Sequence, residues 1–264
     1  MPETEARLLV AAAVSAGVIA KQYFGRDPDV TLKADNSPVS EADMAVNRLL
    51  EQELRSARPE YGWLSEESPD SAERLSAERT FIVDPIDGTR AFLAGESAWG
   101  IAISVVEAGE VIAAAFHMPA KSKTYVAGRG SGAWLNGRRL QVGSGKTLAE
   151  AEVLINKAAL RSEHWHQPPK LPKPHFRPSL TYRLCLVAEG RFDAALTLRD
   201  AWEWDLAPGD LICREAGATV TTRGGALAVY NGASRLQPGL IAAPSALHSE
   251  IRGLLRQEGG AGLA

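Results

Sequence analysis

The chain has 264 residues, of which 45% are hydrophobic and 23% charged, and its formal net charge is −3. This composition is ordinary for a globular protein and excludes a disordered chain, and the length allows one large domain or two lobes that share a core. Because a chain this close to neutral has no broad basic field, we expect no nucleic-acid polymer as a partner.

The first predicted element is a helix over residues 5–24, which contains the apolar run of residues 8–20. Glu3 and Glu5 precede this run, so the basic flank of a signal peptide is missing. The run is also shorter than the ~20 residues of a membrane-spanning helix. We therefore expect a core helix and no membrane partner. The two cysteines lie in apolar helical contexts, which indicates buried thiols in a reducing compartment and predicts a cytoplasmic protein.

The next segments predict a second helix and a group of closely spaced strands. Ser40, with Asp43 three residues later, resembles a capping box and begins a helix that runs to about Arg58. Residues 81–83 are apolar and predict a buried strand that stops at residues 84–85 and delivers carboxylates at its end. Further strands are predicted at residues 100–107, 111–117 and 123–127, and Asn136-Gly137 marks a tight turn. These strands leave no room for crossover helices, so we expect antiparallel or mixed sheets covered by helical layers.

The remaining chain alternates helices and strands after a proline-rich stretch. Residues 162–178 contain five prolines and no periodicity, which predicts a surface excursion or a lobe boundary. Helices are predicted at residues 179–189, 205–216 and 248–257, with a strand at residues 192–198. We expect an N-terminal α+β lobe over residues 1–150 and a C-terminal α/β lobe over residues 151–264, with the functional site at their interface.

The most informative motif is the hexapeptide of residues 84–89, Asp-Pro-Ile-Asp-Gly-Thr. Asp84 and Asp87 flank a proline-stiffened turn and can point at one place, where two ionised carboxylates ~4 Å apart would repel by roughly 1–4 kcal/mol. A divalent cation removes this penalty, and ligands that are all oxygen favour magnesium, manganese or calcium over zinc. A helix that begins near Thr89 would present free N–H groups to a phosphate. The simpler alternative is an acidic β-turn.

Two further carboxylates stand near tryptophans. Glu66 lies just upstream of the hexapeptide, and Asp205 lies far downstream in the sequence Trp-Glu-Trp-Asp before a predicted helix. Each also has a plain explanation: Glu66 can belong to a solvated loop, and Asp205 can be a favourable charge in a first helical turn, worth about 1 kcal/mol. Trp202 is close enough to Asp205 to be a candidate substrate contact.

In combination, these motifs resemble the inositol monophosphatase family of metal-dependent, lithium-sensitive phosphatases. The motifs that carry the resemblance are residues 35–43, Glu-Glu-Ser at 66–68, the hexapeptide at 84–89, residues 128–137, and Trp204-Asp205, and they occur in the order of the family. The resemblance implies a layered αβαβα sandwich of the inositol monophosphatase and fructose-1,6-bisphosphatase type, with mixed and antiparallel sheets, in a homodimer.

The resemblance also implies the metal ligands. Glu66, Asp84 and the backbone carbonyl of Ile86 would hold a first ion, and Asp84, Asp87 and Asp205 a second. The expected metal is Mg²⁺, two or three ions per site, with Mn²⁺ as a substitute.

The remaining implied roles concern catalysis and the substrate, a small phosphorylated metabolite. Thr89, oriented by Asp43, would position and deprotonate a metal-activated water, and Glu66 joins these two as the residues assigned to catalysis. The residues assigned to the substrate are Asp87, Gly88, Thr89 and Asp205. No covalent phosphoenzyme is needed, because phosphoryl transfer asks mainly for positioning and charge neutralisation.

The motifs say less about the substrate itself. Inositol-type members carry an acidic residue seven positions before the Trp-Asp aspartate, and here that position is Leu198. Glu203 and the basic Arg90 are closer to the bisphosphate nucleotidase branch, since an arginine can meet a second phosphate. We therefore predict a 3′(2′),5′-bisphosphate nucleotidase acting on 3′-phosphoadenosine 5′-phosphate. Inositol-1-monophosphatase and histidinol-phosphate phosphatase are the alternatives, and a non-catalytic metabolite sensor or a structural calcium site are alternatives of other classes.

Overall fold

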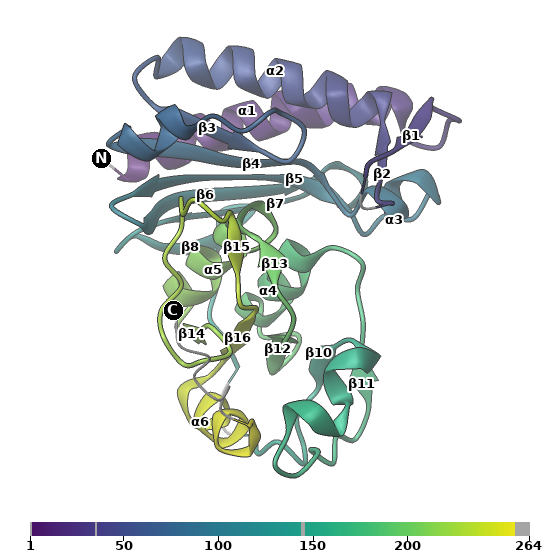
Figure 1. Ribbon diagram of the computed structural model, residues 1–264, viewed down its shortest axis with the longest axis vertical. Coiled ribbons are helices and arrows are strands. Elements are labelled where there is room, and N and C mark those ends of the chain that lie inside the picture. The colour runs from purple at the N-terminus through teal and green to yellow at the C-terminus, as the bar shows by residue number, and fades with distance from the viewer. Residues whose placement is uncertain (1, 35, 144–145, 257–264) are drawn as a thin grey trace.

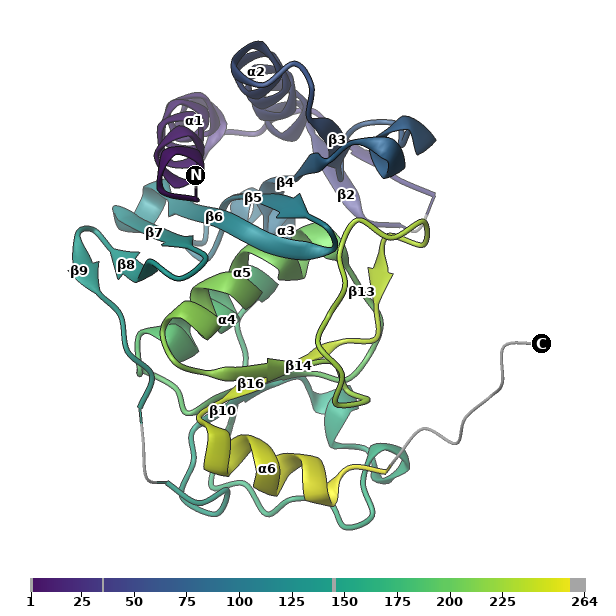
Figure 2. The same ribbon diagram turned by 90° about the vertical axis from the view of Figure 1, so that its left-hand side faces the viewer.

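Helices and sheets alternate in five layers in the computed structural model, which describes residues 2–34, 36–143 and 146–256. Figures 1 and 2 show two helices, a seven-stranded sheet, two central helices, a five-stranded sheet and a final helix, stacked in that order. The predicted αβαβα sandwich with mixed and antiparallel sheets is confirmed. Two residues of the sequence predictions lie outside the described ranges: Asp35 of the upstream motif and Gln257, the expected end of the last helix.

The first layer consists of α1 (Pro2–Tyr23) and α2 (Glu41–Ala57), the two long N-terminal helices. The capping box is present, with Asp43 Oδ2 accepting a hydrogen bond from Ser40 N (2.8 Å). Ser40 Oγ also donates to the same oxygen (2.5 Å). None of the helices formed by the described residues is long and apolar enough to cross a membrane.

The seven-stranded sheet packs between helical layers, so both of its faces are buried. Along β5 the side chains of Ile101 and Ile103 join the core under α1 and α2, while Ala102 and Val106 join the core formed with α4 and α5. Alternation of this kind explains why the strand sequence is apolar throughout. All neighbours pair antiparallel except β3 and β4, which are parallel. In sheet order the strands are β3 (Gly62–Ser65), β4 (Arg79–Asp87), β5 (Gly100–Glu107), β6 (Glu110–Met118), β7 (Lys123–Gly128), β8 (Gly132–Leu135) and β9 (Arg138–Arg139).

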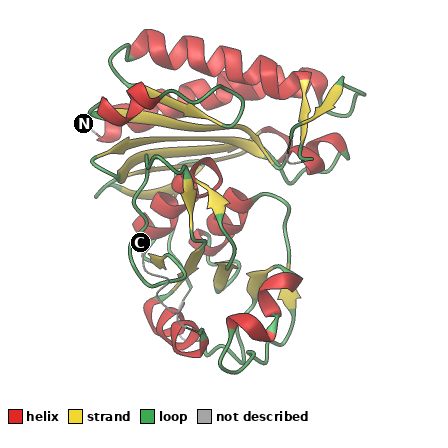
Figure 3. Ribbon diagram, viewed as in Figure 1, coloured by secondary structure: helices red, strands yellow, loops and turns green. Residues whose placement is uncertain are grey.

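The two central helices cross between the sheets, as the colouring by secondary structure makes plain (Figure 3). They are α4 (Leu180–Ala188) and α5 (Glu203–Glu215). Asp205 therefore lies within the first turn of α5, which begins two residues earlier than predicted. Cys185 and Cys213, one on each helix, are buried free thiols.

The second sheet mixes parallel and antiparallel pairs. In order, its strands are β11 (Pro174–His175), β10 (Val153–Ile155), β12 (Ala194–Thr197), β16 (Leu240–Ala243) and β14 (Thr219–Thr221). The outer helix α6 (Ser245–Leu254) covers it. The remaining elements are α3 (Thr89–Leu93), the strand pairs β1 (Val30–Leu32) with β2 (Pro38–Ser40) and β13 (Ala201–Trp202) with β15 (Leu236–Gln237), and the 3₁₀ turns Ala72–Ser76, Pro119–Lys121, Lys157–Leu160 and Ser162–His164.

The proline-rich stretch of residues 162–178 contributes an edge strand to the second sheet. It is not the segment that connects the two sheets. Its β11 pairs parallel with β10, and its end reaches the cavity described below through Phe176 and Pro178. The chain passes from one sheet to the other earlier, between Arg139 and Val153.

Candidate active site

Two aspartates of the hexapeptide face the same way because β4 carries a bulge. Asp84 pairs with Ala102 and Asp87 with Gly100, and the register shifts between the two pairs. In a regular strand, residues three apart point to opposite faces, so one extra residue brings both carboxylates to one side. Pro85 lies inside the bulge, where its missing N–H removes nothing from the ladder. The prediction that the strand stops before this point was wrong, since β4 continues to its second aspartate.

Glu66 reaches the same end of the sheet from the neighbouring strand. β3 runs parallel to β4 with Ser65 opposite Val83, and Glu66 N donates to Val83 O at 3.2 Å. The carboxylate Oε1 of Glu66 lies 2.7 Å from Lys33 Nζ, and the same ammonium lies 2.7 Å from Glu67 Oε1. Glu66 is therefore held at the site by a lysine that the sequence analysis did not single out.

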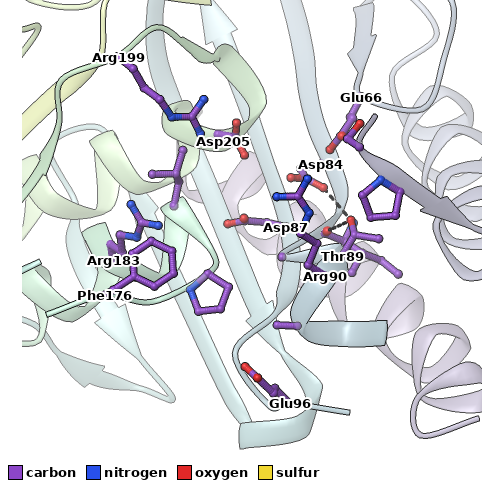
Figure 4. A pocket seen from close by; sticks show the side chains of 17 residues that line it. Glu66, Asp84, Asp87, Thr89, Arg90, Glu96, Phe176, Arg183, Arg199 and Asp205 are labelled. Carbon is purple, nitrogen blue, oxygen red and sulfur yellow. Dashed lines mark hydrogen bonds between the residues drawn. The ribbon is translucent and has the colours of Figure 1, made fainter. Parts of the chain in front are cut away.

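The third aspartate arrives from the first turn of α5, far away in the sequence. Oxygen atoms of Asp84, Asp87 and Asp205 all lie within 4.8 Å of one another. The first two side chains are buried, and Asp205 is partly buried. Figure 4 shows the three carboxylates directed toward a common space between α5 and the end of β4.

One cavity of about 460 Å³ brings together most of the predicted residues (Figure 4). Its lining includes Glu66, Asp84, Ile86, Asp87, Gly88, Thr89 and Asp205. Asp43 does not line the cavity but contacts Thr89, which does. Thr89 Oγ1 lies 3.3 Å from Asp43 Oδ1 and 3.1 Å from the carbonyl oxygen of Ile86. A hydroxyl carries one proton, so Thr89 donates to one of these acceptors at a time.

Burial and mutual repulsion make the aspartates reluctant to ionise together. Burial first, and then the neighbouring carboxylates, raise the pKa of Asp84 well above its usual value, and burial and Asp87 do the same for Asp205. Burial also raises the pKa of Asp87, against the hydrogen bonds that it accepts. A divalent cation that prefers oxygen ligands would relieve this crowding, so the donor set fits a hard cation such as Mg²⁺.

The fold and this geometry agree with what comparison with known proteins shows. The sequence model of the "Inositol monophosphatase family" matches residues 1–259. The chain belongs to the inositol monophosphatase family. Inositol-1-monophosphatase of Rhizobium meliloti is 37% identical over 224 residues, covering 81% of this chain and 84% of the relative. Histidinol-phosphatase of Mycobacterium tuberculosis is 30% identical, with coverage of 95% and 97%.

Among solved structures, the Thermotoga maritima IMPase superposes with a TM-score of 0.80 at 27% identity and covers 95% of this chain and 94% of its own. The chain therefore has the fold of the inositol monophosphatase family, and it is a phosphoric monoester hydrolase. The acidic cluster is consistent with the metal dependence of the family.

In this family member, α4 connects the aspartates from the two halves of the chain. Ser179 Oγ donates to Asp87 Oδ2 (2.6 Å), and Thr181 N donates to the same oxygen (2.9 Å). Thr181 Oγ1 in turn donates to the backbone oxygen of Asp205 (2.9 Å). Ser179 was predicted only as the start of a helix, and it does cap α4, since its Oγ also accepts a hydrogen bond from Tyr182 N.

Two residues singled out beside the Trp-Asp pair do not reach the cavity. Trp202 is absent from its lining and stacks on Trp204, with ring centroids 5.0 Å apart. The buried Glu203 accepts hydrogen bonds from Asn231 N (2.6 Å) and Gly232 N (3.0 Å), so it holds a loop in place. Neither residue lines the cavity, so a substrate contact by Trp202 and the link of Glu203 to the nucleotidase branch stay predictions.

The crowded carboxylates predict that stability depends on pH and on Mg²⁺ together. Their raised pKa values mean that the folded chain binds more protons than the unfolded chain. The contribution of the protonated aspartates to the free energy of unfolding is therefore fully present below about pH 4, and it is lost as pH rises through the raised pKa values. A bound cation replaces the lost protons. We expect Mg²⁺ at ~100 times its Kd to add about 2.7 kcal/mol, or roughly 5–10 °C in Tm.

The measurement is a thermal melt at pH 5.5 and pH 8, in chelator and in Mg²⁺. The Mg²⁺ increment should be larger at pH 8, and in Asp84→Asn, which removes one of the repelling charges, it should shrink at both pH values. An equal increment at both pH values, retained in full by Asp84→Asn, would contradict this assignment.

Proposed function

We propose that this chain is a Mg²⁺-dependent phosphatase that hydrolyses a small, soluble phosphate monoester by direct attack of water. The observation that supports it most is the convergence of Asp84, Asp87 and Asp205 within 4.8 Å, on a cavity that Thr89 also lines. A structural calcium site needs no hydroxyl aimed at a buried carboxylate, and a sensor needs no group that moves a proton.

The proposed ligands follow from the donors at this cavity. Glu66, Asp84 and the carbonyl of Ile86 would hold one ion, and Asp84, Asp87 and Asp205 a second, with Mn²⁺ as a substitute and a third ion allowed. All donors are oxygens, which suits Mg²⁺. When bound, the metal supplies positive charge to phosphate oxygens and lowers the pKa of a water.

The other proposed roles belong to groups of the chain itself. Thr89 orients the attacking water and takes up its proton, while the hydroxyl proton of Thr89 moves to Asp43, the acceptor of its hydrogen bond. Gly88, at φ 98°, allows close approach of backbone to substrate at the start of α3, where the first N–H groups have no acceptor in the helix. We propose that these N–H groups bind the phosphate, beside Asp87 and Asp205.

The finer proposal is a 3′(2′),5′-bisphosphate nucleotidase acting on 3′-phosphoadenosine 5′-phosphate. Arg90 lines the cavity, which supports this proposal, whereas Glu203 lies outside the lining and binds the loop at Asn231. Leu198, at the position where an acidic residue would contact inositol hydroxyls, is buried in the outer core. Inositol-1-monophosphatase and histidinol-phosphate phosphatase activities, named in relatives of this chain, are the alternatives.

The test compares kcat/KM for 3′-phosphoadenosine 5′-phosphate, inositol 1-phosphate and histidinol phosphate side by side. We expect the first to lead by about tenfold, which is ~1.4 kcal/mol of transition-state binding. A lead of either other substrate would reassign the branch. No turnover of a broad panel in Mg²⁺ would favour the sensor, and Ca²⁺ that supports activity as well as Mg²⁺ does would contradict the metal proposal.

Three further properties are proposed with this function. We expect inhibition by Li⁺, a homodimer and a cytoplasmic location, the last supported by the two buried free thiols. We also propose that residues 1–150 and 151–264 act as two lobes with the site between them, since Asp84 and Asp205 come from opposite sides of this division.

A further inference from the structure

Two arginines line the cavity on the side opposite Glu66 (Figure 4). Arg183 belongs to α4, and Arg199 lies in the short connection between β12 and β13. Neither was singled out in the sequence. In Figure 4 both guanidinium groups lie on the α4–α5 side of the three aspartates.

Arg183 is buried, and its direct contacts are with a backbone carbonyl and an aromatic ring. Arg183 is 6% exposed. Its Nε donates a hydrogen bond to the carbonyl oxygen of Arg177 (2.5 Å), and its guanidinium carbon lies 4.4 Å from the centroid of the Phe176 ring. Within the described ranges no carboxylate forms an ion pair with it. A buried charge is costly unless it is compensated, and here the backbone and ring contacts fix the orientation of the guanidinium without neutralising its charge.

Arg199 adds a second positive charge to the same wall. Its side chain is exposed, and no described carboxylate forms an ion pair with it. Burial and the neighbouring charge of Arg199 lower the pKa of Arg183 to about 10, while Asp87 and Asp205 act in the opposite direction. If cations neutralise these two aspartates, that compensation weakens, and the two arginines face the cavity as an uncompensated positive pair.

We propose that Arg183 and Arg199 form a second-anion subsite, which selects phosphate monoesters that carry a further anionic group, a phosphate or a carboxylate. The inference rests on the proposed phosphatase function, because the aspartate cluster must take the scissile phosphate. Guanidinium groups bind such anions through paired N–H donors, and the ring of Phe176 holds one of them in a fixed plane. Monoesters whose second group is a hydroxyl gain nothing from the subsite, and those with an ammonium group are repelled.

The test uses two substrate pairs that differ only in the second group. The phosphate pair is 3′-phosphoadenosine 5′-phosphate against adenosine 3′-monophosphate, and the carboxylate pair is 2-phosphoglycerate against glycerol 2-phosphate. We expect wild type to prefer the doubly anionic member of at least one pair by tenfold or more in kcat/KM, mainly through KM. Which pair shows the preference identifies the second anion.

The variants are Arg183→Gln, Arg199→Gln and their combination, with the exposed Arg26→Gln as matched control. The subsite is supported if the variants lose most of the preference in kcat/KM for the doubly anionic member, while kcat/KM for the singly anionic member stays within about threefold of wild type. Partial recovery of the preference in Arg199→Lys would support it further. An unchanged preference in the double variant, or an equal loss for both members of a pair, would overturn it. If Arg183→Gln lowers Tm, the exposed Arg199→Gln carries the test.

Failure of the phosphatase proposal gives a different result. In that case no member of either pair is turned over in Mg²⁺ by wild type. Calorimetric titration of the same pairs onto wild type and the double variant then decides the subsite alone: a preference that the double variant loses supports it, and equal affinities contradict it.

Discussion

Asp84→Asn is expected to lower kcat at least 100-fold at saturating Mg²⁺ and substrate. Asp84 interacts electrostatically with Glu66, Asp87 and Asp205, and in the proposal it is a ligand of both ions. Loss of one principal electrostatic stabiliser of a transition state typically costs 10²–10³ in rate. Asparagine keeps the size of the side chain and an oxygen for the hydrogen bond from Ile86 N (3.0 Å) to Asp84 Oδ1, so the bulge should survive. The measurement is steady-state hydrolysis of the best substrate over a range of Mg²⁺.

The control is Glu51→Gln, which removes a half-exposed carboxylate of α2 whose ion pair, among the described residues, is with Arg55. Its kcat should equal that of wild type. A loss of less than tenfold in Asp84→Asn, with unchanged dependence on Mg²⁺, would show that this carboxylate is not a ligand of the catalytic metal.

Thr89→Val is expected to lower kcat by about 100-fold while KM changes little. Proton transfer by a positioned group is worth typically 10²–10⁴ in rate, and valine keeps the shape of threonine without the hydroxyl that faces Asp43. Thr89→Ser should recover most of the rate. Asp43→Asn should lower kcat as well and remove a limb of the pH profile, since burial raises the pKa of Asp43.

A merely structural role for Thr89 would give a different pattern. In that case Thr89→Val and Thr89→Ser would differ in Tm and not in kcat, and the pH profile of Asp43→Asn would follow that of wild type.

Local signals were enough to predict the long helices and the long strands of the first sheet, whereas most of the short strands were not predicted. The capping box of Ser40 and Asp43 began α2 as expected, and the Asn136-Gly137 turn lies between β8 and β9 with both residues at positive φ. The β4 bulge was not predictable in this way. Asp84 and Asp87 are an odd number of residues apart, and only the pairing with β5 shows that an extra residue turns them to one side.

Contacts between residues of different helices and strands could not be predicted from the sequence either. The pattern of residues 179–189 indicated a helix but not that Ser179 faces Asp87 or that Arg183 faces the cavity, because those contacts depend on where α4 packs. The direction of Glu203 was not predicted either: two positions along a helix are ~200° of rotation, so it contacts the loop at Asn231 while Asp205 lines the cavity. Phe176 lies in an aperiodic stretch that gave no signal.

The most direct test of the account is an anomalous scattering experiment on crystals soaked in Mn²⁺. We predict strong peaks about 2 Å from carboxylate oxygens of Asp84, Asp87 and Asp205, with a further peak between Asp84 and Glu66. Peaks only at surface carboxylates, with the three aspartates free of metal at saturating Mn²⁺, would contradict it.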